Sequence, residues 1–314
     1  MLCLFIVSVV FIMSELRKGE KEKIEQELRN EKRLRKERKG KVYVQIDWIR
    51  HGFSCSNALS SLKADTIWSV ITEWEFKRHK YAKDAKLTDL GIAQAQVANR
   101  KFFGRHGKFD MICCSQLRRA METAKEVFNG IDKPIYVLPY VNEHRSAMKL
   151  IGMDAQTVPT DWEVRRAEVG DRFNWLFFET LGIKKFVEPS GDKFYRRLLP
   201  LLIYFVNKGR RVPLGTSERP IRLAIVSHQL FIRDILDIEE GISNTGIWTE
   251  KFSYDMKKRS VEKRVGKKAI YKPEYIVFNG RKIVYGDKGK IEGKYLKEEA
   301  ISRCGITDIV KFDY

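Results

Sequence analysis

The sequence has few of the residues from which metal sites and disulfide frameworks are built. Its five cysteines, Cys3, Cys55, Cys113, Cys114 and Cys304, form no CxxC pair, and its five histidines form no HExxH motif. Neither a disulfide framework nor a zinc site is therefore predicted. Sparse, unpaired cysteines also indicate that the catalytic part folds in a reducing compartment.

Acidic residues are also scarce relative to basic ones. The 314-residue chain carries 60 Lys plus Arg against 41 Asp plus Glu, a formal net charge of +19. Both ends, 1–41 and 246–314, are more basic per residue than the middle. This excess predicts an anionic partner, such as a phosphorylated substrate, nucleic acid or acidic lipid, without choosing among them. A hydrophobic content of 43% is enough for a buried core and excludes disorder throughout the chain.

Long apolar runs are confined to the first 13 residues, which carry no charge. As a helix they would reach about 20 Å, against about 30 Å for the hydrocarbon core of a bilayer. They lack the basic start and the small-residue cleavage site of a signal peptide. We therefore interpret 1–13 as an apolar N-terminal segment that could anchor a cytoplasmic protein in a membrane, with a poorly defined chain end as the alternative. Residues 14–41 alternate charge signs and predict a helical stalk or linker.

Strand-like and helix-like segments alternate from residue 42 onward. Runs rich in apolar and β-branched residues, typical of buried strands, occupy 42–49, 111–115, 134–141 and 221–227. Helical patterns separate them, as over 116–128. This order predicts an α/β fold, a three-layer α/β/α sandwich with a mostly parallel central sheet, over residues 42–288. Ligands of such sheets bind beyond the carboxyl ends of the strands, where His51 and His228 fall.

The tail contains a hairpin signal and two charged segments. Asn279-Gly280 between two apolar runs predicts a β-hairpin over 275–286. The segment 257–268 before it is interpreted as a charged loop. Residues 289–314 are interpreted as a basic C-terminal extension.

Two Arg-His-Gly tripeptides occur, and their surroundings differ. The copy at 50–52 ends a predicted strand and is followed by Ser54 and Asn57, whose side chains can hydrogen-bond phosphate. No predicted strand precedes the copy around His106, so His106 is interpreted as a surface-loop residue. The segment 50–57 (RHGFSCSN) resembles the RHGx(S/T)xxN signature of the histidine phosphatase superfamily, in its phosphoglycerate-mutase-like branch.

Further motifs follow in the order that this family requires. They are LTDLG at 87–91, SQLRRAMETA at 115–124, VNEH at 141–144, EPSGDKFYRR at 188–197 and VSH at 226–228. The resemblance covers about residues 42–252. It implies a phosphoglycerate-mutase-like sandwich in which residues 144–219 form a variable cap above the pocket.

The resemblance implies a covalent mechanism. His51 would attack phosphorus as a neutral imidazole and form a phosphohistidine, and Glu143 would protonate the leaving oxygen and later take a proton from water. A phosphate dianion nearby would raise the pKa of Glu143 and so favour its protonated form. These two residues, with Arg50, Arg119 and His228, form the predicted catalytic set.

The predicted phosphate site is built from guanidinium groups. Arg50 and Arg119, placed at neighbouring strand ends, would each clamp phosphoryl oxygens with two N–H groups, and His228 would donate to another. By the resemblance, Ser54 and Asn57 complete the cradle. Because the arginines neutralise the phosphoryl charge, the mechanism needs no metal and no cofactor is predicted.

Two neighbouring patterns compete with this assignment. Arg118 lies beside Arg119, but the Arg-Ala spacing of the motif favours Arg119 and leaves Arg118 on the solvent face. Cys113 to Arg119 also fits the C-x5-R spacing of cysteine-dependent phosphatases. No glycine-rich loop follows the cysteine, so Cys113 is interpreted as a structural residue.

The predicted activity is that of a metal-independent phosphatase acting on phosphomonoesters. The stretch 143–154 resembles poorly the glycine-bearing segment with which a phosphoglycerate mutase retains its bisphosphate, so mutase-type phosphoryl transfer is the alternative. Phe53 and Gln229 depart from the family pattern and leave open a weakened, phosphate-binding or membrane-associated module.

The predicted partners are a phosphorylated substrate and, through residues 1–41, an acidic membrane surface. Nucleic acid is disfavoured because no RNA-module motif or interleaved aromatic pattern accompanies the basic ends. In the predicted cap, Arg165, Arg166 and Arg172 could bind a second anionic group of the substrate or form a solvated helix face. The sequence does not indicate an oligomeric state.

Overall fold

The computed structural model describes residues 40–58, 84–103, 108–143, 162–184, 187–285, 291–292 and 302–304. The predicted anchor at 1–13 lies outside these ranges, as do the stalk up to residue 39, His106 and most of the extension 289–314. Within the ranges, no helix combines the length and the apolar character that crossing a membrane requires. The membrane anchor therefore stays a prediction.

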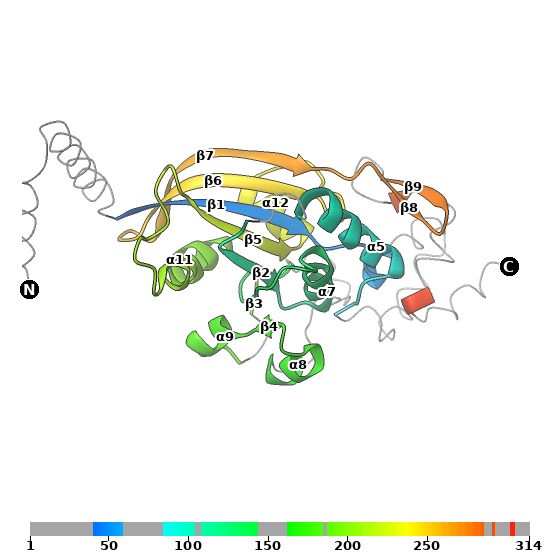
Figure 1. Ribbon diagram of the computed structural model, residues 1–314, viewed down its shortest axis with the longest axis horizontal. Coiled ribbons are helices and arrows are strands. Elements are labelled where there is room, and N and C mark those ends of the chain that lie inside the picture. The colour runs from blue at the N-terminus through cyan, green and yellow to red at the C-terminus, as the bar shows by residue number, and fades with distance from the viewer. Residues whose placement is uncertain are drawn as a thin grey trace, which may run out of the picture.

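Within the described ranges, seven strands form one central sheet (Figure 1). Their spatial order is β4 (Phe173–Asn174), β3 (Ile135–Leu138), β2 (Met111–Ser115), β5 (Ile221–Ser227), β1 (Lys41–Arg50), β6 (Ile247–Asp255) and β7 (Ser260–Tyr271). The first five strands are parallel to one another. β6 joins β1 in antiparallel fashion, and β7 joins β6 in the same way. The prediction of a mostly parallel sheet is confirmed.

Helices cover both faces of this sheet and bury its central strands. One face carries η3 (Phe194–Leu198), α11 (Leu199–Asn207) and α12 (Gln229–Leu236), and the other carries α5 (Asp89–Ala98) and α7 (Arg118–Val127). Trp48 of β1 points to the first face, where its ring lies 5.3 Å from that of Phe194 and 5.8 Å from that of Phe231. Its neighbour Ile49 packs against the α5–α7 face. The three-layer α/β/α sandwich is confirmed.

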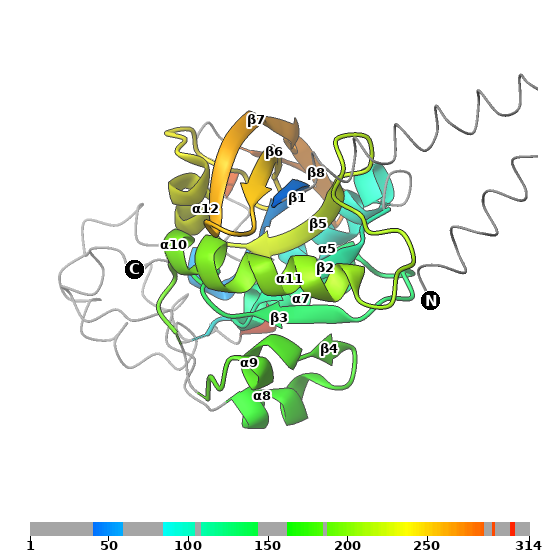
Figure 2. The ribbon, with the colours of Figure 1, turned by 90° about the vertical axis from the view of Figure 1, so that its left-hand side faces the viewer.

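Smaller elements lie at the two ends of the sheet. Beside β4, at the edge opposite β7, lie α8 (Trp162–Val169) and α9 (Leu176–Thr180), as Figures 1 and 2 show. Helix α5 continues into η1 (Asn99–Phe103), and α10 (Gly191–Lys193) precedes η3.

A second sheet joins β8 (Tyr275–Phe278), β9 (Arg281–Tyr285) and β10 (Ile291–Glu292). Asn279 and Gly280 have φ values of 48° and 74°, so the predicted hairpin between β8 and β9 is confirmed.

The segment 257–268 is a strand over most of its length, so its interpretation as a loop is wrong. From Ser260 onward it forms β7, which pairs with the buried strand β6 along the edge of the sheet. The side chains of 262–268 are exposed on both faces, so the period-two alternation that signals a strand is absent. Charged residues suit an exposed edge strand because they discourage pairing with another chain.

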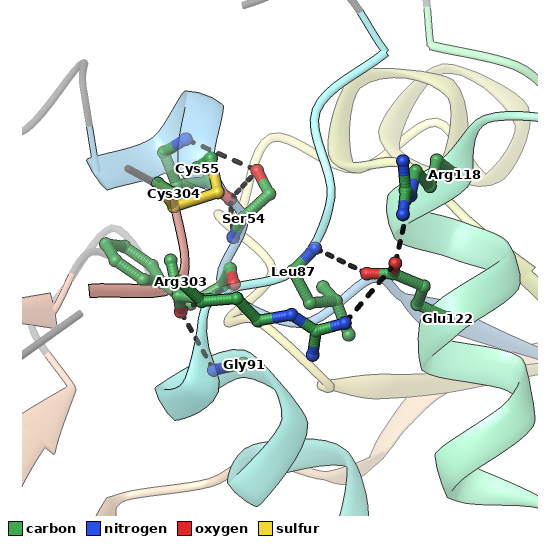
Figure 3. The surroundings of a disulfide bond; sticks show 11 residues. Ser54, Cys55, Leu87, Gly91, Arg118, Glu122, Arg303 and Cys304 are labelled. Atoms are coloured by element: carbon green, nitrogen blue, oxygen red, sulfur yellow. Dashed lines mark hydrogen bonds and ion pairs between the residues drawn. A yellow bond between two sulfur atoms is a disulfide. The ribbon is translucent and has the colours of Figure 1, made fainter. Parts of the chain in front are cut away.

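A disulfide joins Cys55 to Cys304 across 249 positions of sequence (Figure 3). The expectation that these cysteines are unpaired is therefore wrong, and the cysteines no longer indicate a reducing compartment. Cys55 opens a helical turn just after β1, and Cys304 ends η4 (Ser302–Cys304). Arg303 adds an ion pair to Glu122 of α7, at 3.8 Å. The same carboxylate also pairs with Arg118. Two cysteines so far apart have no spacing signature, because only the returning chain brings them together.

We expect this disulfide to stabilise the fold by holding the C-terminal segment against the turn after β1. Reduction, or Cys304→Ser, should lower the free energy of unfolding by about 2–4 kcal/mol. Thermal unfolding should then occur about 5–15 °C lower. Thermal melts with and without a dithiol reductant measure this shift. Reductant should leave the Tm of the Cys304→Ser variant unchanged, and equal melting of oxidised and reduced wild type would contradict the prediction.

Candidate active site

The parallel strands β1 and β5 bring the two motif histidines together. Arg50 pairs with Ser227 as the last residue of each strand, so His51 and His228 each follow at the same edge of the sheet. Their ring centroids lie 5.1 Å apart. Both side chains are buried. The site therefore lies at the carboxyl end of the sheet, as predicted for a parallel α/β fold.

Two glycines let the loop after His51 pack directly on the start of α5. A Cβ on Gly52 would lie 2.7 Å from the carbonyl oxygen of Gly91, and a Cβ on Gly91 would lie 2.1 Å from that of Phe53. The Thr88 hydroxyl caps α5 by accepting from the Gly91 N–H and donates to the Phe53 carbonyl. The glycines of the RHG and LTDLG motifs are thus required by one backbone-to-backbone contact.

Hydrogen bonds fix which nitrogen of His51 carries its proton. Nδ1 lies 2.7 Å from the carbonyl oxygen of Gly52, which can only accept, so Nδ1 carries the hydrogen. The Nε–H of Arg119 donates to Nε2 at 3.3 Å, so Nε2 presents a lone pair. Burial first, then the positive charges of Arg119 and Arg50, hold the pKa of His51 well below 6.5. His51 is therefore a neutral imidazole whose Nε2 lone pair accepts from Arg119.

Arg119 and Arg50 supply buried positive charge on two sides of His51. Arg119 lies in the first turn of α7 and is 4% exposed, and its Nη1 has no hydrogen-bond partner among the described residues. Arg50 ends β1, and its Nη1 donates to the carbonyl oxygen of Ile242. Arg118, by contrast, has a 47% exposed side chain that pairs with Glu122. Of the two neighbouring arginines, only Arg119 faces the histidines.

His228 lies immediately before α12 and is fully buried. Its Nε2 lies 2.8 Å from the hydroxyl oxygen of Ser115, the last residue of β2. Its Nδ1 has no hydrogen-bond partner among the described residues. Burial, then the charges of Arg119, His51 and Arg50, hold the pKa of His228 well below 6.5.

Glu143 follows β3 and completes the cluster. Its Oε1 accepts from the backbone N–H of Leu230 in the first turn of α12, at 3.1 Å. Burial raises the pKa of this carboxyl above 4.5, although Arg119 and Arg50 oppose the shift. The structure thus brings together all five residues of the predicted catalytic set at one edge of the sheet.

Ser54 and Asn57 lie next to the cluster but bind each other. The Ser54 hydroxyl donates to Asn57 Oδ1 at 2.9 Å, and the Ser54 backbone N–H donates to the same oxygen. Asn244 Nδ2 approaches Asn57 Oδ1 at 3.5 Å and donates to the backbone carbonyl of His51 at 3.0 Å. These contacts shape the turn that follows His51. Their predicted contact with phosphate stays a prediction.

Within the described ranges, one group of three residues could offer ligand atoms to a metal ion, namely His51, Glu143 and His228. Their candidate atoms lie within 4.8 Å of one another. Arg119 lies 3.3 Å from one of these atoms, and the charges of Arg119 and Arg50 oppose a cation at this position. The same charges suit a phosphoryl dianion, whose oxygens guanidinium groups bind well.

Several residues that hold this site were not assigned a role from the sequence. Thr123 accepts from the Gly52 N–H and Gln94 from the Phe53 N–H, which fixes the loop after His51. Thr123 and Ser115 stand at matched positions of the SQLRRAMETA motif, so the motif contained that signal. No sequence motif indicated a role for Gln94 or Asn244, because their contacts join chain segments that lie far apart in sequence.

The cysteines beside this motif lie in the core. Cys113 and Cys114 are free, fully buried residues of β2, and burial raises the pKa of both thiols. A nucleophilic cysteine needs an accessible thiolate. The geometry therefore disfavours cysteine chemistry here.

The three cap arginines each bind a protein group. Arg165 is buried and pairs with Asp84, which also accepts from the backbone N–H of Arg118. Arg166 pairs with Glu179 at the surface, and Arg172 donates to the backbone carbonyl of Phe128. Arg165 therefore anchors α8 beside the start of α7. A solvated helix face thus fits the exposed Arg166 but not the buried Arg165, and binding of a second anionic group stays a prediction.

A family model described as the histidine phosphatase superfamily (branch 1) matches residues 71–256. The match begins after His51, so the assignment of Arg50 and His51 depends on the motif at 50–57 and on the geometry above. The matched range includes Arg119, Glu143 and His228.

Two curated relatives are similar over part of the chain. The adenosylcobalamin/alpha-ribazole phosphatase of Salmonella typhi is 32% identical over 115 residues, which cover 33% of this chain and 54% of that protein. Its counterpart in Salmonella typhimurium is 44% identical over 57 residues, covering 18% and 27%. The chain thus spans about half of the first relative's length and about a quarter of the second's.

The solved structures that the chain matches include two phosphatases. A mycobacterial glucosyl-3-phosphoglycerate phosphatase matches with a TM-score of 0.40 at 16% identity, covering 73% of this chain and 98% of that one. The alpha-ribazole phosphatase of Shigella flexneri matches with a TM-score of 0.35 at 18% identity, covering 66% and 90%.

We expect the buried pair between Arg165 and Asp84 to matter for stability. Arg165→Ala would leave the Asp84 carboxylate buried without its cation, at a cost of about 3–5 kcal/mol in the free energy of unfolding. Arg166, like Arg165, lies on α8; Arg166→Ala breaks its exposed pair with Glu179 of α9 and should cost about 0–1 kcal/mol. Urea unfolding at neutral pH compares the two variants. Equal stability of both would contradict an anchoring role for Arg165.

Proposed function

The chain belongs to the histidine phosphatase superfamily, and from that premise we propose that it is a phosphatase that hydrolyses phosphomonoesters through a phosphohistidine on His51. The names of two curated relatives, both adenosylcobalamin/alpha-ribazole phosphatases, support this reaction class. The single observation that carries the proposal is the orientation of His51. A neutral imidazole whose Nε2 lone pair faces a buried guanidinium is poised to attack an anionic phosphoryl group.

In the first step, the phosphoryl group enters the space between Arg50, Arg119 and His228. Its oxygens take over the N–H groups of Arg119, which releases the Nε2 lone pair of His51 for in-line attack. A P–N bond forms to Nε2, and the bond between phosphorus and the leaving oxygen breaks. Glu143, whose pKa is raised by burial, gives its proton to that oxygen, so the alcohol leaves neutral.

In the second step, the Glu143 carboxylate accepts a proton from water as the water oxygen attacks phosphorus. The P–N bond breaks and its electron pair returns to Nε2 of His51. Inorganic phosphate leaves, and both residues recover their initial protonation states. The two arginines supply the positive charge in both steps, so we propose that the reaction needs no metal ion.

Mutase-type phosphoryl transfer is the second candidate. It would require a glycine-bearing segment that retains the second phosphate. The stretch 143–154 resembles such a segment poorly, and all of it after Glu143 lies outside the described residues. A weakened phosphate-binding module is the third candidate, based on Phe53 and Gln229. The buried Phe53 has both backbone groups hydrogen-bonded, to Gln94 and Thr88, so the loop after His51 is fixed in spite of this departure.

We expect the full chain to hydrolyse an aryl phosphate in the presence of a chelator. His51→Ala should lower kcat by about three orders of magnitude or more, because it removes the nucleophile. Denaturing the wild type in alkali during turnover should trap a phosphoprotein that is stable in base and is lost on later treatment with acid. Equal rates in wild type and His51→Ala, or no turnover by the wild type, would refute the proposal.

The adjacent arginines offer a matched pair of variants. Arg119→Ala should lower kcat/KM by about 10²–10³-fold, because it removes a buried donor to the phosphoryl group. Arg118→Ala deletes the same side chain one position away, on the solvent face, and should stay within about threefold of wild type. Similar losses in both variants would indicate damage to α7 and not a specific role for Arg119.

The raised pKa of Glu143 and the lowered pKa of His51 predict a bell-shaped pH dependence. Activity should fall at low pH as His51 becomes protonated, and at higher pH as Glu143 loses the proton that the leaving oxygen needs. Glu143→Gln should abolish the alkaline fall and should slow an alkyl phosphate much more than an aryl phosphate. Stopped assays of both substrates across pH measure this. An unchanged alkaline limb in Glu143→Gln would exclude Glu143 as the acid.

A further inference from the structure

A chain of three buried side chains leads from the core of the protein to His228. Nε2 of His228 lies 2.8 Å from the Ser115 hydroxyl oxygen, which lies 2.8 Å from Oδ1 of Asn142. Nδ2 of Asn142 in turn lies 3.1 Å from the carbonyl oxygen of Val187. His228, Ser115 and Asn142 are all 0% exposed, so bulk water does not compete for these hydrogen bonds.

The donors and acceptors among these side chains allow only one direction of hydrogen bonding. The Val187 carbonyl can only accept, so the amide nitrogen of Asn142 faces it and Oδ1 faces Ser115. Oδ1 carries no hydrogen, so the single hydroxyl proton of Ser115 is donated to it. Ser115 can then offer His228 only a lone pair. Nε2 of His228 must therefore carry the hydrogen.

The two histidines of the site are thus held in opposite tautomers. His51 carries its hydrogen on Nδ1, which donates to the Gly52 carbonyl, and presents a lone pair at Nε2. His228 carries its hydrogen on Nε2, and its Nδ1 has no hydrogen-bond partner among the described residues. Nη1 of Arg119 is likewise buried and unpartnered there. A bound oxyanion could accept directly from Nη1 of Arg119, but from Nδ1 of His228 only once that nitrogen carries a proton.

We propose that Ser115 and Asn142 are positioning residues that hold His228 in the Nε2–H tautomer, so that its Nδ1 bonds a phosphoryl oxygen only after taking up a proton. The inference rests on the proposed function, because it concerns the same phosphoryl site. Neutral His228, a phosphoryl dianion and one proton combine to give an imidazolium paired with the dianion. Substrate binding and proton uptake are then a single event, and the Ser115 contact decides which nitrogen receives the proton.

The charges around His228 explain why the proton arrives only with the ligand. Arg119 of α7, and Arg50 and His51 at the end of β1, all oppose an imidazolium, and burial opposes it further. Glu143, after β3, is the acidic group of the cluster, and burial raises its pKa, which weakens the support that its negative charge could give to an imidazolium. In the free protein His228 is therefore neutral at neutral pH. A phosphoryl dianion adds two negative charges beside the ring and reverses this balance.

Selective ¹⁵N labelling of histidine tests this inference directly. The chain has five histidines, so the spectrum is simple, and His228→Gln identifies the signals of His228. Two-bond ¹H–¹⁵N correlations distinguish the two neutral tautomers from the imidazolium. Tungstate is a suitable probe near pH 7.5, because it is a tetrahedral dianion that brings no proton of its own, and free histidine is largely neutral at that pH.

The wild type should show the Nε2–H tautomer of His228 when free and the imidazolium when saturated with tungstate. Ser115→Ala should give a mixture of tautomers and bind tungstate about 3–10-fold more weakly, since one charge-assisted hydrogen bond is partly lost. Asn142→Ala provides a second, opposite test. With Oδ1 removed, the Ser115 hydroxyl can donate to His228, so the tautomer should shift towards Nδ1–H.

Ser227→Ala is the matched control. Ser227 is also a buried serine that ends a central strand, and its hydroxyl donates to the Val141 carbonyl at 2.7 Å without contacting His228. It loses one buried hydrogen bond, as Ser115→Ala does, but should keep the wild-type tautomer and the tungstate-induced imidazolium. Similar spectra for the two serine variants would show that the effect is general loosening of the site and would refute the positioning role.

Failure of this inference is distinguishable from failure of the proposed function. If tungstate binds and His51 is required for hydrolysis, but His228 stays neutral in the complex or is Nδ1–H when free, only the inference on Ser115 and Asn142 is wrong. If tungstate perturbs no histidine signal and aryl phosphate is not hydrolysed, the phosphoryl site itself is wrong.

Discussion

Two guanidinium groups are buried at the carboxyl ends of the central strands, and the state of each neighbouring residue depends on their charge. Arg50 and Arg119 help to hold the pKa values of His51 and His228 well below the usual range, after burial itself. They also partly offset the effect of burial on Glu143. Without an anion, the pocket contains concentrated positive charge beside neutral imidazoles. That imbalance explains why the same residues disfavour a metal cation and suit a phosphoryl group.

The residues around this charge are held in place by close contacts, some of which leave no room for a side chain larger than glycine. Gly52 and Gly91 allow the loop after His51 to touch the start of α5, and Thr88 links the two segments. Arg165 joins α8 to the start of α7, the helix that carries Arg119, through Asp84. The disulfide between Cys55 and Cys304 adds a covalent link between the turn after β1 and the C-terminal segment. The reactive side chains are few, and a larger set of polar residues keeps them in position.

Much of the fold could be predicted from the sequence because its signals are local. Continuous apolar runs at 42–49 and 221–227 indicated buried parallel strands, and Asn279-Gly280 indicated a hairpin, which the structure confirms. The edge strand β7 could not be recognised, because both of its faces are exposed and its side chains do not alternate. The contact between Cys55 and Cys304 could not be predicted either, since it depends on where the chain returns after 249 positions.

The sequence by itself determined the family and the five residues proposed for catalysis, because their motifs are short and each follows a strand or opens a helix. Only the tertiary structure decided how these residues are oriented. The tautomer of His51 depends on Gly52 beside it and on Arg119, 68 positions away. The tautomer of His228 depends on Ser115, 113 positions away, and through it on Asn142. Hydrogen bonds are directional and short, so the proton on each ring is set by neighbours that only folding brings within 3.3 Å.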